Sequence, residues 1–252
     1  MGRFKQSFAW WSFGREVHDA AGFLRQARAI GYQGVELLPQ ELWDAARAAD
    51  LVIATESVGK IERGLNRREH HADIEEELKR KLDLAVRYGI PNLIVFSGNR
   101  AGLTDEAGAL VTAEGLRRLA PLAEAAGVTL VLELLNSKVD HIDYQCDQSA
   151  WGVLVMSLVN ASHVKLLYDV YHMQIMEGDI IRTIRQIAPH IGHVHTGGNP
   201  GRRDLDETQE LYYPPIMAAL AETGYTGFVG QEFIPRGDAL AALRTAWQLC
   251  NV

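Results

Sequence analysis

The chain has 252 residues, of which 47% are hydrophobic and 23% are charged, a balance typical of a globular protein with a large core. Its 25 basic and 32 acidic side chains give a formal net charge of −7, which argues against nucleic acid or an anionic membrane as the main partner. The two cysteines, Cys146 and Cys250, are not spaced as in a disulfide scaffold or a zinc finger. The sequence contains neither a signal-peptide pattern nor a run of 18 apolar residues, so we expect a cytoplasmic protein without membrane association.

Short apolar segments alternate with longer helical patterns along the chain. In chain order, the predicted strands are Phe4–Ala9, Gly34–Leu38, Leu51–Thr55, Asn92–Phe96, Val128–Leu134, Val164–Tyr168, Ile191–His195 and Gly227–Glu232. The helices predicted between and after them are Asp19–Ile30, Glu69–Tyr88, Asp105–Ala126, Gln148–Asn160, Gly178–Ile187, Pro215–Thr223 and Asp238–Leu249. This alternation is typical of an α/β fold.

Three of the predicted helices end at a glycine that is followed by a short turn and a strand: Gly31, Gly89 and Gly224. Runs such as LIVFS and VTLVLEL are almost continuously apolar, as expected of strands covered on both faces. Eight strands alternating with helices predict a (β/α)₈ TIM barrel, which we expect to form a single domain over residues 1–252. The alternative, an open doubly wound sheet, would require a glycine-rich phosphate-binding turn after the first strand, and that turn is missing from the sequence.

Ionisable residues lie near the ends of the last four predicted strands. They are Glu133, Asp169, the pair His193 and His195, and Glu232. In a TIM barrel, catalytic residues come from the C-terminal ends of the strands. Each residue alone has a simpler explanation: Asp169 could cap the following turn, and we expect one of the two histidines to be structural. Their coincidence on four consecutive strands favours a common site.

A divalent metal site explains this set of residues. Carboxylates among apolar side chains are costly to bury without a compensating cation, and carboxylate and imidazole groups suit Mg²⁺, Mn²⁺ or Co²⁺. We therefore expect Glu133, Asp169, His195 and Glu232 to hold one such ion. The site suits removal of a proton next to a carbonyl through an enediolate, with Glu133 and Glu232 as the acid–base pair.

At these residues the chain resembles the hydroxypyruvate isomerase family of the xylose isomerase-like TIM barrels. The phrases that carry the resemblance extend from the first predicted strand to the last: FAWWSF, YQGVELL, VGKIERGLNR, FSGNR, LELLNSKVDH, LLYDVYHMQIMEGD, IGHVHTGGNPGR and GFVGQEFIP. The resemblance implies an enzyme of carbohydrate metabolism that holds one divalent cation on Glu133, Asp169, His195 and Glu232. It also implies that the two glutamates form the catalytic pair.

The resemblance extends to the substrate. It implies that His172 and Arg202 contact substrate oxygens, and it places Asn136 in a position suited to a polar substrate contact. Arg202 could hold a carboxylate through two hydrogen bonds, as a keto acid would need. Trp10 and Trp11 follow the first strand, and we expect one of them to form an apolar wall of the site.

The expected activity is an aldose–ketose-type isomerisation of a small hydroxy-carbonyl compound, such as hydroxypyruvate to tartronate semialdehyde. A ketose 3-epimerase is the alternative, because the HVH phrase with His195 resembles that branch, whereas bacterial hydroxypyruvate isomerases tend to have Gln there. A metal-dependent endonuclease would need more histidines and a basic face, and a catalytically silent subunit would not need the full set of ligands. We also expect a homo-oligomer, with Tyr212 and Tyr213 available to a partner.

Overall fold

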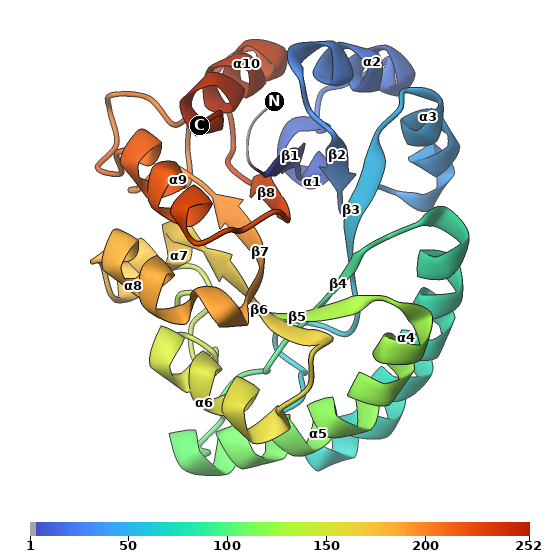
Figure 1. Ribbon diagram of the computed structural model, residues 1–252, viewed down its shortest axis with the longest axis vertical. Coiled ribbons are helices and arrows are strands. Elements are labelled where there is room, and N and C mark those ends of the chain that lie inside the picture. Colours follow the sequence, from blue (N-terminus) through green and yellow to red (C-terminus); the bar gives the residue numbers. More distant parts are fainter. Residues whose placement is uncertain (1–3) are drawn as a thin grey trace. The chain divides into compact units, whose positions relative to one another are not determined.

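The computed structural model describes residues 4–252, so the first three residues of the predicted domain lie outside the described residues. Strands and helices alternate along this part of the chain (Figure 1). The strands are β1 (Lys5–Phe8), β2 (Gly34–Glu36), β3 (Val52–Ser57), β4 (Asn92–Val95), β5 (Thr129–Glu133), β6 (Val164–Asp169), β7 (Ile191–Thr196) and β8 (Phe228–Gln231). The helices are α1 (Trp10–Phe13), α2 (Ala20–Ile30), α3 (Trp43–Ala48), α4 (Arg68–Tyr88), α5 (Asp105–Ala126), α6 (Ser149–Val159), α7 (Val170–Met176), α8 (Ile180–Ile187), α9 (Tyr213–Glu222) and α10 (Ala239–Cys250), with short 3₁₀ turns at Gln40–Leu42 and Ala188–His190.

The strands form one sheet in the order β1-β8-β7-β6-β5-β4-β3-β2. Pairing is parallel: for example, Leu93 of β4 is opposite Leu130 of β5, and the register of β2 against β3 shifts by one residue between Val35 and Glu36, which places Glu36 opposite Thr55. A further parallel bridge joins Ala9, just after β1, to Glu36 at the end of β2. Parallel neighbours connected through helices are the (β/α)₈ TIM barrel, so the predicted fold class is confirmed.

The chain divides into two compact units. The first comprises residues 4–55, 179–188 and 194–252 of the described chain, and the second comprises residues 56–178 and 189–193. The expectation of a single domain over residues 1–252 stays a prediction.

Aromatic side chains form part of the core of the first unit. The ring of Phe8, at the end of β1, lies edge-on to Tyr32, Phe23 and Phe13, with centroids 5.4, 6.0 and 6.1 Å away. The Tyr32 hydroxyl donates a 2.9 Å hydrogen bond to the carbonyl of Leu243 in α10, so the buried phenol has a partner. Helices α2 and α10 therefore lie side by side over this cluster (Figure 1).

The second unit is built around β4, β5 and β6. The β5 residues Leu130, Val131 and Leu132 are fully buried, as the apolar run predicts. Helix α5 packs between α4 and α6 (Figure 1). It begins at Thr104, whose hydroxyl accepts from the amide of Ala107, and ends at Gly127, which has the left-handed conformation that glycine adopts at low cost.

All the predicted strands and helices are found with their ends within two residues of the prediction. Three helices of the described chain were not predicted: α1, α3 and α7. They have four, six and seven residues, which is too short for a repeated apolar spacing to be recognised.

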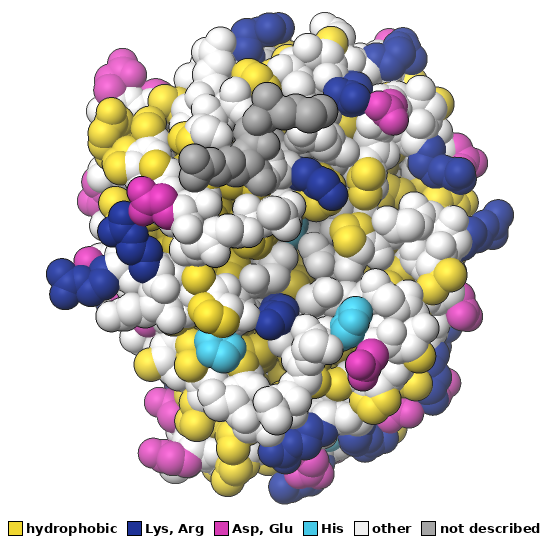
Figure 2. Space-filling model, in the orientation of Figure 1, with side chains coloured by type: hydrophobic (Ala, Val, Ile, Leu, Met, Phe, Trp, Pro, Cys, Tyr) yellow, Lys and Arg dark blue, Asp and Glu magenta, His cyan; other side chains and the backbone are white. Residues whose placement is uncertain are grey.

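No helix among the described residues is long and apolar enough to cross a membrane. On the face of the molecule shown in Figure 2, basic and acidic side chains are interspersed and do not gather into one basic patch. The predicted absence of a nucleic-acid partner stays a prediction.

Candidate active site

His195 and Glu232 lie at the ends of the neighbouring strands β7 and β8 in the first unit. The strands are paired so that His195 is opposite Gly230, and the amide of Glu232 donates to the carbonyl of Thr196. This register brings His195 Nδ1 to 2.9 Å from Glu232 Oε2. His195 is fully buried and Glu232 is 5% exposed, so two of the predicted site residues meet in a place largely closed to water.

The Glu232 carboxylate is also held by Trp11 and Arg202. Trp11 Nε1 donates to its Oε1 at 2.8 Å, and Arg202 forms an ion pair with its Oε2. The Arg202 guanidinium lies 5.2 Å from the centroid of the Trp11 ring, a cation–π distance. Burial on its own would raise the pKa of Glu232, but the charges of His195 and Arg202 and the hydrogen bonds more than offset this, so its pKa is lowered from the usual value. Glu232 is therefore an anchored, ionised carboxylate.

Trp11 rather than Trp10 is therefore the tryptophan that reaches the site. Trp10 is 9% exposed, and its ring packs edge-on against Phe23 with centroids 5.8 Å apart.

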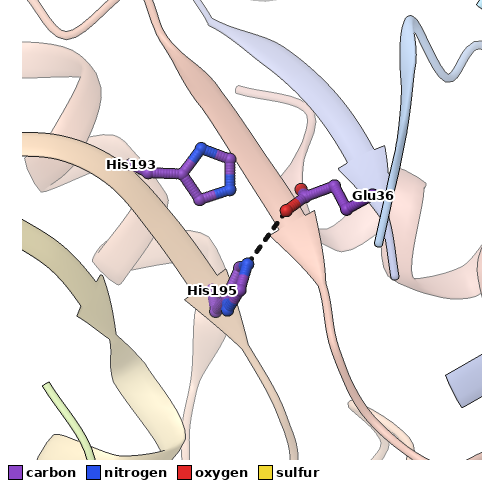
Figure 3. Close-up of side chains that lie close together, drawn as sticks. All are labelled: Glu36, His193 and His195. Carbon is purple, nitrogen blue, oxygen red and sulfur yellow. Dashed lines mark hydrogen bonds and ion pairs between the residues drawn. The ribbon is translucent and has the colours of Figure 1, made fainter. Parts of the chain in front are cut away.

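Glu36, at the end of β2, belongs to the same cluster and was missed by the sequence analysis. It is fully buried and accepts hydrogen bonds from Thr55 Oγ1 at 2.8 Å, from His195 Nε2 at 3.0 Å and from the Ser7 hydroxyl. Figure 3 shows its carboxylate turned toward the His195 ring. The signal was present in the sequence, because the YQGVELL phrase ends a strand with a glutamate just as the later strands do.

Gly230 leaves the space in which Glu36 and His195 meet. A Cβ atom at this position would lie 2.2 Å from Glu36 Oε1 and 2.9 Å from His195 Cδ2. Both distances are shorter than van der Waals contact, so any larger residue at this position would have to displace the Glu36 carboxylate.

His193 precedes His195 on β7 and has a different neighbour. Its Nδ1 lies 3.4 Å from the side-chain nitrogen of Asn92, and the ring is fully buried. All three side chains drawn in Figure 3, Glu36, His193 and His195, are fully buried.

In the second unit, Glu133 and Asp169 end the neighbouring strands β5 and β6. Glu133 is 6% exposed and Asp169 is 1% exposed. Asp169 Oδ1 accepts from the amide of His172 at 3.1 Å and caps α7. The expectation that Asp169 could cap the following turn is therefore confirmed. The other oxygen, Oδ2, lies 3.7 Å from His172 Nε2. The cap therefore uses one carboxylate oxygen and places His172 beside the other.

Asn136 lies behind His172, in the loop after β5. Its Nδ2 is 2.6 Å from His172 Nδ1 and 2.7 Å from Asp140 Oδ2, while its Oδ1 accepts from the amides of Val139 and Asp140. An amide nitrogen can only donate, so His172 Nδ1 is the acceptor and the proton of the neutral ring is on Nε2. The fully buried Asn136 thus orients His172.

Replacing Asn136 by Ala is expected to destabilise the protein by about 1–3 kcal/mol, because two loop amides lose their acceptor and His172 loses its donor. The kcat of this variant should also fall, because His172 is no longer held in one orientation. Urea unfolding and steady-state kinetics measure the two effects. The exposed Asn251, replaced by Ala, is the control and should leave both within error. Wild-type stability in the Asn136 variant would contradict the role given to this side chain.

The two tyrosines considered for a subunit contact differ in exposure. Tyr212 is 73% exposed, but Tyr213 is 1% exposed, and its hydroxyl donates to the carbonyl of Gly197 at 2.8 Å and accepts from the amide of Gly197 at 2.9 Å. The expectation that Tyr213 is available to a partner is wrong, because its hydroxyl is satisfied by backbone groups inside the protein. Homo-oligomerisation stays a prediction.

The fold and the buried carboxylates and imidazoles at its strand ends define a TIM-barrel enzyme. A family model described as xylose isomerase-like TIM barrel matches residues 24–248, and the chain belongs to this family. It is 32% identical to a 2-oxo-tetronate isomerase of Cupriavidus necator, with 68% of this chain and 66% of that protein covered. It is 29% identical to the hydroxypyruvate isomerase of Escherichia coli K12, with 68% and 67% covered.

Among solved structures, the chain is similar to one described as an AP endonuclease, family 2, from Brucella melitensis. The identity is 26%, the TM-score is 0.87, and the whole of both chains is covered. The resemblance to the hydroxypyruvate isomerase family is confirmed by these comparisons, and so is the prediction that the chain is an isomerase-type enzyme.

Proposed function

We propose that the protein is a divalent-metal-dependent isomerase of a small, unphosphorylated hydroxy-carbonyl compound, of the hydroxypyruvate to tartronate semialdehyde type. The observation that carries this proposal is the buried, ionised Glu232, held between His195, Arg202 and Trp11 at the end of β8. The isomerase names of the relatives support the same class of reaction.

The cation in this proposal is held by Glu133, Asp169, His195 and Glu232. The chemistry of these donors fits the ion, because carboxylate oxygens and an imidazole nitrogen are ligands that Mg²⁺, Mn²⁺ and Co²⁺ accept. Support comes from the burial of all four side chains. A bound cation would polarise the substrate carbonyl and acidify the adjacent C–H bond.

Glu133 and Glu232 form the proton-transfer pair in this proposal. The charges of His195 and Arg202 keep Glu232 in the ionised form that a proton acceptor needs, although the same charges weaken its basicity. The electron pair of the broken C–H bond then forms the enediolate, and return of a proton to the neighbouring carbon completes the isomerisation. Asp169 and His195 have no proton-transfer role.

In this proposal the substrate is bound by Arg202 and His172, and Asn136 orients His172. Arg202 lies beside the catalytic Glu232, where its planar guanidinium suits a substrate carboxylate. His172 presents Nε2–H as a donor to a substrate oxygen. Asn136, given as a direct contact in the sequence analysis, acts through its hydrogen bond to His172 Nδ1.

A panel of three- to six-carbon ketoses and keto acids, incubated in D₂O with Mn²⁺ and followed by NMR, tests the proposal. Isomerisation of hydroxypyruvate moves the carbonyl and places deuterium on the former carbonyl carbon. A ketose 3-epimerase, which the His195 of the HVH phrase favours as the alternative, would exchange the C3 proton and keep the ketone. Absence of carbon-bound exchange in every compound would count against both activities.

A further inference from the structure

We propose that Glu36 is a positioning residue for His195: its carboxylate holds the Nε2–H of the imidazole, so that Nδ1 is directed at Glu232 and at the cation of the proposed function. This inference rests on the proposed function in one respect, namely that a divalent cation binds at His195. The contact between Glu36 and His195 stands on the geometry of the first unit alone.

The first step is the environment of Glu36. The side chain is fully buried, and hydrogen bonds reach it from elements far apart in the sequence: Ser7 on β1, Thr55 on β3 and His195 on β7. A buried carboxylate without partners is costly, so a site that surrounds it with donors holds it in one orientation. The two hydroxyl groups fix Glu36 and leave it aimed at the imidazole.

The second step is what Glu36 does to the ring. An ionised carboxylate can only accept, so the Nε2 of His195, 3.0 Å from Glu36 Oε2, carries the hydrogen. Nδ1 lies 2.9 Å from Glu232 Oε2, so without the cation it carries a hydrogen as well, which it would lose on binding the ion. Histidines that bind metals commonly donate their second N–H to a carboxylate, and loss of that partner weakens metal binding about 10- to 100-fold.

The third step is that the sequence makes room for this contact. Gly230 on β8 faces both side chains, and any Cβ there would collide with Glu36 Oε1. Glu36 is therefore not one of the proposed ligands. It orients one of them, His195.

The test compares wild type with Glu36→Gln, which keeps the shape and removes the charge. Mn²⁺ binding is measured by calorimetry, and the Nε2–H resonance of His195 is followed in protein labelled with ¹⁵N-histidine. We expect the Glu36→Gln variant to bind Mn²⁺ about 10- to 100-fold more weakly and its Nε2–H resonance to move upfield. The resonance is assigned by its loss in His195→Gln.

Two threonine variants complete the design. Thr55→Val removes one donor to Glu36 without touching His195, and it should weaken Mn²⁺ binding by roughly 2- to 10-fold even if Glu36→Gln does not fold. Thr112→Val is the matched control, because Thr112 is equally buried but lies in α5 of the second unit. Its Mn²⁺ affinity should equal that of wild type.

Wild-type Mn²⁺ affinity together with an unmoved Nε2–H resonance in Glu36→Gln would overturn the inference. If wild type bound a second Mn²⁺ ion and Glu36→Gln lost it, the inference would also be overturned, because Glu36 would then be a ligand. If wild type binds no Mn²⁺, the metal in the proposed function is wrong, while the His195 resonance still decides whether Glu36 holds the ring.

Discussion

Replacing Glu232 or Glu133 by Gln is expected to lower kcat by roughly 10²- to 10⁴-fold, the usual contribution of a general acid or base. The substitution keeps the shape of each side chain but removes the group that takes up the proton. Glu232 is the sharper case, since His195 and Arg202 hold it ionised in wild type and an amide in the same place cannot act as a base. Steady-state kinetics and circular dichroism separate this loss from unfolding.

Glu222→Gln is the matched control for this pair. Glu222 is on α9, its side chain is 57% exposed, and it forms a surface ion pair with Arg185. Such pairs contribute little, so its turnover and melting temperature should stay close to those of wild type. A Glu232→Gln or Glu133→Gln protein that retains more than about a tenth of wild-type kcat would remove that residue from the proton-transfer pair.

Chelation of divalent cations is expected to abolish turnover, and added Mn²⁺, Mg²⁺ or Co²⁺ should restore it. Binding to the folded state alone stabilises it by mass action, by about 2.7 kcal/mol at a free ion concentration of 100 times Kd. For a chain of this length, that corresponds to a rise in Tm of roughly 5–10 °C. Differential scanning calorimetry of the chelated and reloaded protein measures the shift.

Asp169→Asn serves as the comparison in this experiment. It keeps the capping oxygen of α7 but weakens a proposed ligand, so its Tm should respond much less to added Mn²⁺. Full turnover after exhaustive chelation, with no change in Tm on reloading, would show that the reaction does not use the cation.

The fold could be predicted because its local signals agree. The run around Leu130 to Leu132 is apolar on both faces, and glycines such as Gly31 and Gly127 mark the ends of helices. The short helices α3 and α7 were missed, since six or seven residues carry no clear period. The first turn of α7 is instead specified by the cap from Asp169. From the sequence, this residue could equally be a helix cap or a metal ligand.

The residues of the proposed site could be predicted as the ends of strands, but their contacts could not. Glu133, Asp169, His195 and Glu232 each close an apolar run, and the rule that catalytic groups gather at strand ends identifies them. Glu36 also closes a strand, but its importance depends on Ser7, Thr55 and His195, whose approach is set by strand pairing. Likewise, the interaction of Arg202 with both Glu232 and Trp11 depends on the path of a loop that has no periodic pattern.

The two oxygens of Asp169 have separate tasks. Oδ1 accepts from the amide of His172 in the first turn of α7, whereas Oδ2 lies 3.7 Å from His172 Nε2 and is the oxygen that the proposed ligand role would use. The first turn of α7 therefore depends on the oxygen that the proposed ion would not need, and the imidazole of His172 is oriented by Asn136. Loading and unloading of the ion should leave this corner of the enzyme assembled, so that substrate meets an already oriented His172 whichever of the two arrives first.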